Sequence, residues 1–112
     1  MPRLNYVELP VRDIAPAKAF YERAFGWDLT DFGPTYAATL TGDTDIGLQA
    51  DAAEATKAPL PVIDVDNLEA ALATVEAAGG RIVKPIFAFP GGRRFHFLDP
   101  SGNELAAVEG DR

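Results

Sequence analysis

Apolar and polar residues follow one order along this chain, and that order occurs twice. In the first half, alternation over residues 4–11 predicts a strand, because successive strand side chains point to opposite faces. Apolar residues then recur at helical spacing over residues 14–24, after Asp13 as a candidate N-cap, and Gly26 is a typical helix stop. Three short strand-like runs follow, at residues 27–30, 36–41 and 45–50.

The second half repeats this order, starting with a strand-like run at residues 60–65. Asp66 and Glu69 have the spacing of a capping box, which predicts the start of a second helix. The helical pattern runs to Gly79 and Gly80, where it stops. Three further strands are predicted at residues 82–89, 94–98 and 104–109.

The two halves therefore read as two copies of one βαβββ module. A shift of 53 residues places Asp13 on Asp66. We expect module one at residues 1–51, a linker at 52–58 and module two at 59–112. One module alone leaves a sheet face uncovered, so two modules can close a shared interior. The predicted fold class is α+β, with the two modules forming an open, cup-shaped mixed β-sheet barrel and the helices outside.

The composition narrows the range of partners. Ten basic and seventeen acidic residues give a net charge of -7, and such a surface repels phosphate backbones and anionic membranes. The chain has no cysteine, which excludes disulfides and thiolate chemistry. No apolar run approaches the length of a membrane span. We therefore expect a cytoplasmic protein with neither a nucleic-acid nor a membrane partner.

Several segments carry a family resemblance. They are Leu9–Asp13, Ala19–Glu22 and Phe25–Trp27 in the first half, and Ala77–Gly80 and Gly92–Leu105 in the second. On these segments the chain resembles the vicinal-oxygen-chelate superfamily, which includes glyoxalase I, bleomycin-resistance proteins and extradiol dioxygenases. The resemblance covers nearly the whole chain and implies the fold, whereas this fold serves many reactions. It also implies a homodimer.

The resemblance implies where a metal would be held. Metal-using members bind a divalent cation with four inward side chains, typically His, Gln or Glu, from the first and last strands of each module. Those positions fall here on Tyr6, Gly47, Pro59 and Ala106. Three of these side chains have no donor atom, and neutral tyrosine is a poor ligand for such ions. We therefore expect no metal cofactor, with a divalent metal at a relocated site as the alternative.

Candidate ligand-binding residues lie in the first and third predicted strands of module one. Tyr6 and Glu8 share a strand face, and by the family comparison that face is the inner one. Glu8 could act as a base or accept a hydrogen bond from a ligand. Alternatively, it is a solvated or ion-paired side chain at the rim. Gln49 is a possible polar contact on the face of Gly47, or lines the edge of the site.

In module two the candidates are Arg94 and His96. Phe95 and Phe97 are expected to face the helix, which turns Arg94 and His96 inward. His96 is the only histidine and could act as a proton shuttle or contact a ligand. Alternatively, it is a strand histidine hydrogen-bonded to a neighbouring carboxylate or to the backbone. Arg94 and its neighbours could bind an anion, or belong to a hairpin turn. Core or wall positions are predicted for the aromatic residues Trp27, Phe32, Tyr36, Phe87 and Phe89.

These residues support two functional hypotheses from different classes. The first is a metal-independent protein that binds a small organic molecule in the cup, as bleomycin-resistance proteins do. The second is a lyase or isomerase related to lactoylglutathione lyase, with Glu8 and His96 as catalytic residues of a relocated site. A purely structural or partner-binding role is a third possibility. We prefer the first, because donor-poor residues occupy all four expected ligand positions.

Overall fold

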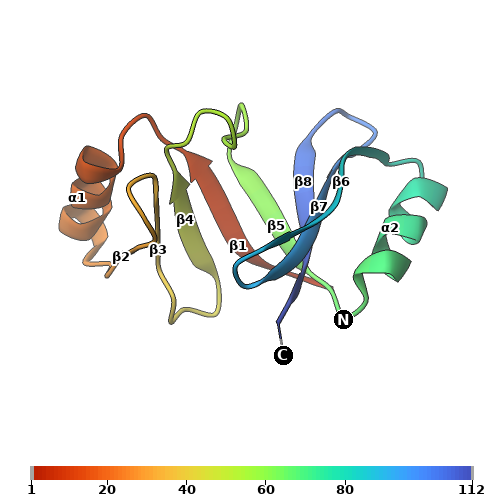
Figure 1. Cartoon of the computed structure of the whole chain (residues 1–112), viewed down its shortest axis with the longest axis horizontal. Helices are drawn as coiled ribbons and strands as arrows, with labels where there is room; N and C mark the ends of the chain where they lie inside the picture. Colours follow the sequence, from red (N-terminus) through yellow and green to blue (C-terminus); the bar gives the residue numbers. More distant parts are fainter. Residues whose placement is uncertain (1, 112) are drawn as a thin grey trace. The chain divides into compact units, whose positions relative to one another are not determined.

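The computed structural model describes residues 2–111 and divides into two compact units (Figure 1). The N-terminal unit comprises Tyr6–Leu60, and the C-terminal unit comprises Pro61–Arg112 with the first five residues. In chain order, the first five elements are β1 (Arg3–Pro10), α1 (Ile14–Phe25), β2 (Thr30–Asp31), β3 (Tyr36–Ala38) and β4 (Asp45–Gln49). The remaining five are β5 (Leu60–Asp64), α2 (Leu68–Ala77), β6 (Arg81–Phe89), β7 (Gly92–Leu98) and β8 (Glu104–Gly110).

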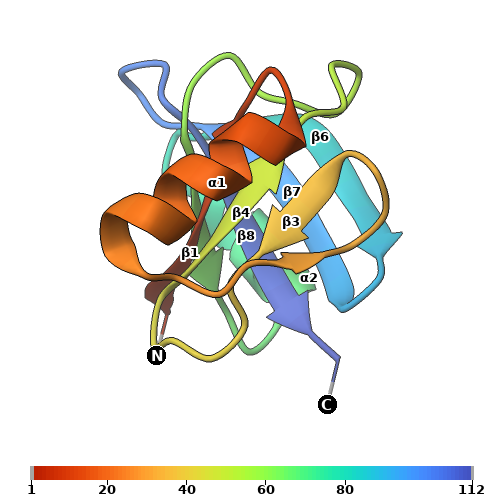
Figure 2. The ribbon, with the colours of Figure 1, turned by 90° about the vertical axis from the view of Figure 1, so that its left-hand side faces the viewer.

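The N-terminal unit is a four-stranded mixed sheet covered on one face by a helix. Its strands lie in the order β2-β3-β4-β1, with β1 parallel to β4 and the other pairs antiparallel. Figure 2 shows α1 lying across this sheet. The buried residues between them are Ile14, Leu29, Ala37 and Leu48. Strand side chains alternate, so every second residue points to the opposite face of this sheet, which α1 does not cover.

The C-terminal unit repeats this plan with different residues. Its strands lie in the order β5-β8-β7-β6, with β5 parallel to β8 and the hairpins antiparallel. The core against α2 consists of Val65, Leu68, Phe95, Phe97 and Ala107. Phe95 and Phe97 thus face the helix, as predicted, so Arg94 and His96 belong to the helix-free face. The α+β class and the two βαβββ modules are confirmed.

The helix ends follow the predicted signals in one unit and differ in the other. Gly26 ends α1 in the left-handed conformation (φ 69°), and its N–H donates to the Glu22 carbonyl. The α2 N-cap is Asn67, one residue later than predicted, and its side chain accepts a hydrogen bond from the Ala70 N–H (3.0 Å). The predicted capping box at Asp66 is therefore wrong. Glu69 instead pairs with Arg93 on β7.

Two aromatic residues predicted for the core or wall are exposed. Trp27 precedes β2 and is 39% exposed, and Phe32 follows β2 and is 52% exposed. The run at residues 27–30 was predicted as a strand, but the strand begins only at Thr30. Trp27 stacks on Tyr21 and Phe25 of α1, with ring centroids 5.6 and 5.2 Å away. Trp27 therefore packs along the side of α1 instead of filling the core.

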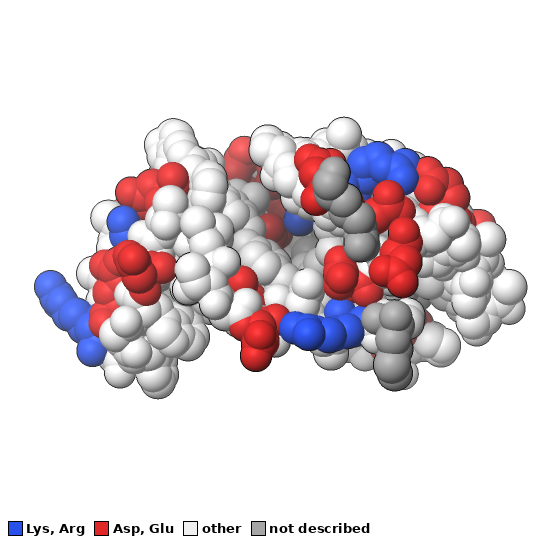
Figure 3. Space-filling model, turned by 90° about the horizontal axis from the view of Figure 1, so that it is seen from below, with Lys and Arg blue, Asp and Glu red and all other residues white. Residues whose placement is uncertain are grey.

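No helix within residues 2–111 is both long enough and apolar enough to cross a membrane. On the face shown in Figure 3, Lys and Arg side chains lie in small separate groups beside Asp and Glu side chains. Such a face offers little to a polyanion, because neighbouring carboxylates cancel the positive potential. The absence of nucleic-acid and membrane partners stays a prediction.

Candidate functional site

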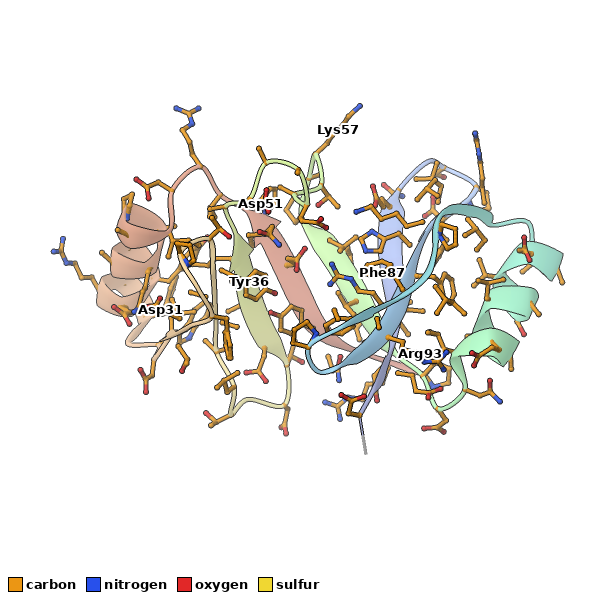
Figure 4. The ribbon with its side chains drawn as sticks, viewed as in Figure 1. Asp31, Tyr36, Asp51, Lys57, Phe87 and Arg93 are labelled. Carbon is orange, nitrogen blue, oxygen red and sulfur yellow. The ribbon has the colours of Figure 1, made fainter. Side chains whose placement is uncertain are left out.

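The helix-free face of the N-terminal sheet gathers the predicted residues of module one. The parallel register places Glu8 opposite Gly47, and the antiparallel register places Tyr36 opposite Gln49. Directly paired residues point to the same face. Tyr6 joins them by its spacing of two from Glu8. Figure 4 shows Tyr36 lying against the strands of this sheet.

Two tyrosines and a glutamate form a chain of hydrogen bonds on this face. The Tyr36 hydroxyl donates to Oε1 of Glu8 at 3.0 Å, and it also contacts the Tyr6 hydroxyl. Because the Tyr36 proton is directed at Glu8, Tyr6 is the donor to the Tyr36 oxygen. Glu8 is only 2% exposed. The proton order is therefore Tyr6 to Tyr36 to Glu8, and it ends on a buried carboxyl group.

The surroundings of Tyr36 keep its hydroxyl protonated. Burial raises the pKa of Tyr36 far above its usual value, and the negative charge of Glu8 raises it further. An ionised tyrosine here would place a second negative charge beside Glu8. Tyr36 therefore remains a hydrogen-bond donor throughout the neutral range.

Gly47 is the residue around which this cluster is built. A Cβ atom at this position would overlap the hydroxyl oxygens of both Tyr6 and Tyr36. The two phenol groups thus occupy the space in which the expected fourth-strand metal ligand would begin. Any larger side chain at Gly47 would displace them. This position is filled by hydroxyl groups of neighbouring strands, and it does not fit a metal ligand.

The matching positions of module two, Pro59 and Ala106, do not fit a metal either. Pro59 is exposed and precedes β5, and Ala106 is buried on β8 opposite His96. Within residues 2–111, no group of three or more His, Cys, Asp or Glu side chains is arranged to hold a metal ion. The donor set expected from metal-using relatives is therefore not present in the described part of the chain.

Gln49 lies on the same face, and its side-chain oxygen is used in a hydrogen bond with the backbone. It is 9% exposed, and its Oε1 accepts a hydrogen bond from the Asp51 N–H at 3.0 Å. This bond holds the chain where it leaves β4. Its amide nitrogen is the group with which Gln49 could donate to a ligand, so its predicted binding role stays a prediction.

The helix-free face of the C-terminal sheet holds His96 and Arg94. His96 is fully buried, and its Nδ1 lies 2.8 Å from Oε2 of Glu104 on the neighbouring strand β8. Burial lowers the pKa of His96, and the positive charges of Arg94 and Lys84 lower it further, whereas the hydrogen bond that its ring donates to Glu104 raises it. The imidazole is therefore neutral at pH 7.

The two neighbouring arginines have separate environments. Arg94 places its guanidinium carbon 5.2 Å from the ring centroids of both Phe87 and Phe89, a cation–π arrangement. Arg93 points to the helix side, where it pairs with Glu69 and with Glu109 (3.5 Å). Figure 4 labels Phe87 and Arg93 in this unit. Arg94 belongs to the candidate site, whereas Arg93 ties α2 to the sheet.

The sequence interpretation missed the roles of two residues. Tyr36 was predicted as core or wall, and Glu104 was not considered. Both act through a neighbouring strand, and only the register reveals this: Tyr36 lies near Glu8 through β4, and Glu104 lies opposite Leu98, diagonal to His96. The sequence did offer one signal. Glu104 is the first residue after the turn that follows the strand of His96, so a hairpin brings the two residues close together.

The paired βαβββ modules, each with a helix-free face of clustered polar side chains, define a glyoxalase-type α+β protein. The chain belongs to the Glyoxalase/Bleomycin resistance protein/Dioxygenase superfamily, whose family model matches residues 3–107. This confirms the family resemblance found in the sequence.

Similar proteins support the same assignment. "Putative glyoxylase CFP32" of Mycobacterium bovis is 29% identical over 119 aligned positions, which cover 96% of this chain and 46% of the relative. The chain thus spans about half the length of the curated relatives it matches, which include the same-named protein of Mycobacterium tuberculosis.

Solved structures share the fold at low sequence identity. Methylmalonyl-CoA epimerase from Mycobacterium tuberculosis superimposes with a TM-score of 0.79 at 18% identity, covering 97% of this chain and 88% of that one. The Mn(II)-bound glyoxalase from Novosphingobium aromaticivorans gives 0.71 at 22% identity, covering 97% of this chain and 40% of that one. At these identities the likeness establishes the fold alone.

Proposed function

We propose that this protein binds a small organic molecule on the helix-free face of its N-terminal sheet without using a metal ion. The observation that carries the proposal is Gly47. Its missing side chain leaves room for the hydroxyl groups of Tyr6 and Tyr36 at the position where metal-using relatives place a ligand. The lone pairs of phenolic oxygens can accept hydrogen bonds from an O–H or N–H group of a ligand, so the ligand can be held without coordination to a cation.

The buried carboxyl group of Glu8 supports the same role. Burying an ionisable group is costly, and proteins retain such groups mainly where they bind or react. Here Glu8 fixes the hydroxyl of Tyr36, which in turn fixes that of Tyr6. A cluster whose protons are already ordered loses little freedom when a ligand arrives, and this favours binding.

The proposal is tested by a thermal-shift screen of small organic molecules, run with and without a chelator. A bound ligand stabilises the folded state by mass action. We expect hits whose shifts are unchanged by the chelator. Tyr36→Phe should weaken their binding by about five- to tenfold, which corresponds to one hydrogen bond of roughly 1 kcal/mol.

Tyr21→Phe is the matched control, since Tyr21 packs on the helix side of the same sheet. It should leave ligand affinity unchanged. A chelator that abolishes every hit would contradict the proposal, and so would equal binding by the Tyr36→Phe variant and the unmodified protein.

A second candidate function is that of a lyase or isomerase related to lactoylglutathione lyase. The observation that favours it is the pairing of His96 with Glu104, because a carboxylate that orients an imidazole is a common arrangement for general bases. Glu8 would be the second catalytic group. Formation or cleavage of lactoylglutathione should then fall at least a hundredfold in Glu8→Gln and in His96→Ala. Unchanged turnover in both variants rejects this alternative.

A further inference from the structure

His96 has one ring nitrogen that the described part of the chain leaves unused. Its Nδ1 contacts Glu104, whereas its Nε2 is buried and has no hydrogen-bond partner within residues 2–111. The whole side chain is 0% exposed. Buried polar atoms in native proteins nearly always have a partner, so an unused one indicates a group that is still to be bound.

The identity of that group follows from the tautomer of His96. The carboxylate of Glu104 accepts hydrogen bonds and cannot donate one, so Nδ1 carries the proton. In a neutral imidazole the other nitrogen, Nε2, then has a lone pair and no hydrogen. It can only accept a hydrogen bond, which means that its partner must be a donor.

The imidazole ring of His96 has an aromatic neighbour. The Phe87 ring lies 5.9 Å from the imidazole, tilted by 40°, and β6 and β7 place Lys84 opposite His96. Aromatic walls of this kind pack well against planar molecules. Ala106, directly opposite His96 on β8, adds only a methyl group to this face.

We propose that Nε2 of His96 accepts a hydrogen bond from a planar small molecule that carries a ring-edge N–H or O–H donor, and that Glu104 is the positioning residue which fixes this polarity. This inference rests on the proposed function, because it concerns the same class of small organic ligand. The contact that it names lies within the C-terminal sheet.

The test compares indole with 1-methylindole by ligand-detected NMR titration. The two probes have the same ring system, and only indole can donate from its nitrogen. The unmodified protein should bind indole about tenfold more tightly, as expected when one buried hydrogen bond is lost. In Glu104→Lys the side-chain ammonium can only donate, which places the ring proton on Nε2, so the preference for indole should disappear. His96→Gln should also lose it.

A second measurement needs neither a ligand nor a variant, because NMR can read the tautomer of His96 directly in the unmodified protein. The chain has a single histidine, so its ¹⁵N resonances need no assignment. They should report the proton on Nδ1 in the unmodified protein and on Nε2 in Glu104→Lys. A proton on Nε2 in the unmodified protein overturns the inference, as does equal binding of the two indoles.

Failure of this inference is distinguishable from failure of the proposed function. If neither indole binds, or if a water molecule is found as the only partner of Nε2, the inference is overturned. The proposed function falls only if the wider chelator-controlled screen also yields no ligand.

Discussion

The helix-free faces of the two units are built on the same βαβββ plan, but they carry different polar groups. In the N-terminal unit, Gly47 on the last strand leaves room for the hydroxyl groups of two tyrosines, whose hydrogen bonds end on the buried Glu8. In the C-terminal unit, alanine takes the corresponding position, and the neighbouring strand supplies His96 with its carboxylate partner. On one face the hydroxyl protons of Tyr36 and Tyr6 are used in hydrogen bonds that end on a carboxyl group, and on the other face a carboxylate orients an imidazole whose second nitrogen is an acceptor.

This difference shows that the fold fixes where polar groups can converge, while single small residues decide which groups do so. Gly47 and Ala106 both lack donor atoms, yet their consequences differ. A glycine admits hydroxyls from two neighbouring strands, whereas a methyl group leaves the space to the ring of His96 across the strand pair. Inheriting the family's fold therefore does not mean inheriting its metal site.

The largest effect on stability is expected from a methyl group added at Gly47, the residue that distinguishes the N-terminal face. In Gly47→Ala the new Cβ would overlap the hydroxyls of Tyr6 and Tyr36, so the buried cluster must shift. We expect a loss of about 1–3 kcal/mol in the free energy of unfolding, measured by urea denaturation. Gly110→Ala is the matched control, because its Cβ would meet only the Gly91 carbonyl oxygen, at 3.8 Å. Equal stability of the two variants would refute the assigned role of Gly47.

Removing a single hydroxyl should have a smaller effect. Tyr36→Phe takes away the donor to Glu8 while leaving the ring in place. The expected cost is about 1–2 kcal/mol in the free energy of unfolding, since the hydrogen bonds of Tyr36 with Glu8 and with Tyr6 are both lost. Tyr21→Phe should change this free energy by much less. If chemical denaturation gives the same value for both variants, the hydrogen-bond chain does not stabilise the fold.

The C-terminal face can be examined through the titration of His96. Because burial lowers its pKa in the folded state, the unfolded chain takes up a proton first as the pH falls below 6.5. Stability should therefore be fully present above that pH and decrease below it. NMR of the single histidine should show a folded-state pKa under 6.5, and His96→Gln should flatten this part of the stability profile. A folded-state value above 6.5 would contradict the assigned environment.

The smallest effect is expected outside both faces, at the pair of Glu69 and Arg93. The hydrogen bond from Arg93 lowers the pKa of Glu69 from 4.5 to about 2. The contribution of this pair is present above pH 4.5 and is lost as the pH falls toward 2. Glu69→Gln should make the melting temperature slightly less dependent on pH in this range. Glu76→Gln, on the same helix, serves as the control, and identical profiles for the two variants would argue against the pair.

The sequence predicted the fold closely because the periodicities of strands and helices are local. Residues 82–89 were predicted as a strand and form most of β6, and the predicted helix stop at Gly26 is the observed C-cap. The misplaced α2 cap has a local cause as well. Asp66 and Asn67 are both good capping residues, and in the structure it is the Asn67 side chain that caps α2.

The candidate site was predictable only in part. Strand alternation correctly put Tyr6 with Glu8, and Arg94 with His96, on the helix-free faces. The role of Tyr36 depends on a strand pairing between residues 28 positions apart, and the meaning of Gly47 depends on what surrounds it. Neither can be read from local spacing, because register is fixed by the tertiary structure.

The most direct test of the account is elemental analysis of untagged protein purified without a chelator, combined with ligand titration before and after metal addition. The account predicts less than stoichiometric divalent metal and an affinity that added metal does not change. One tightly bound transition metal per chain, required for ligand binding, would contradict it.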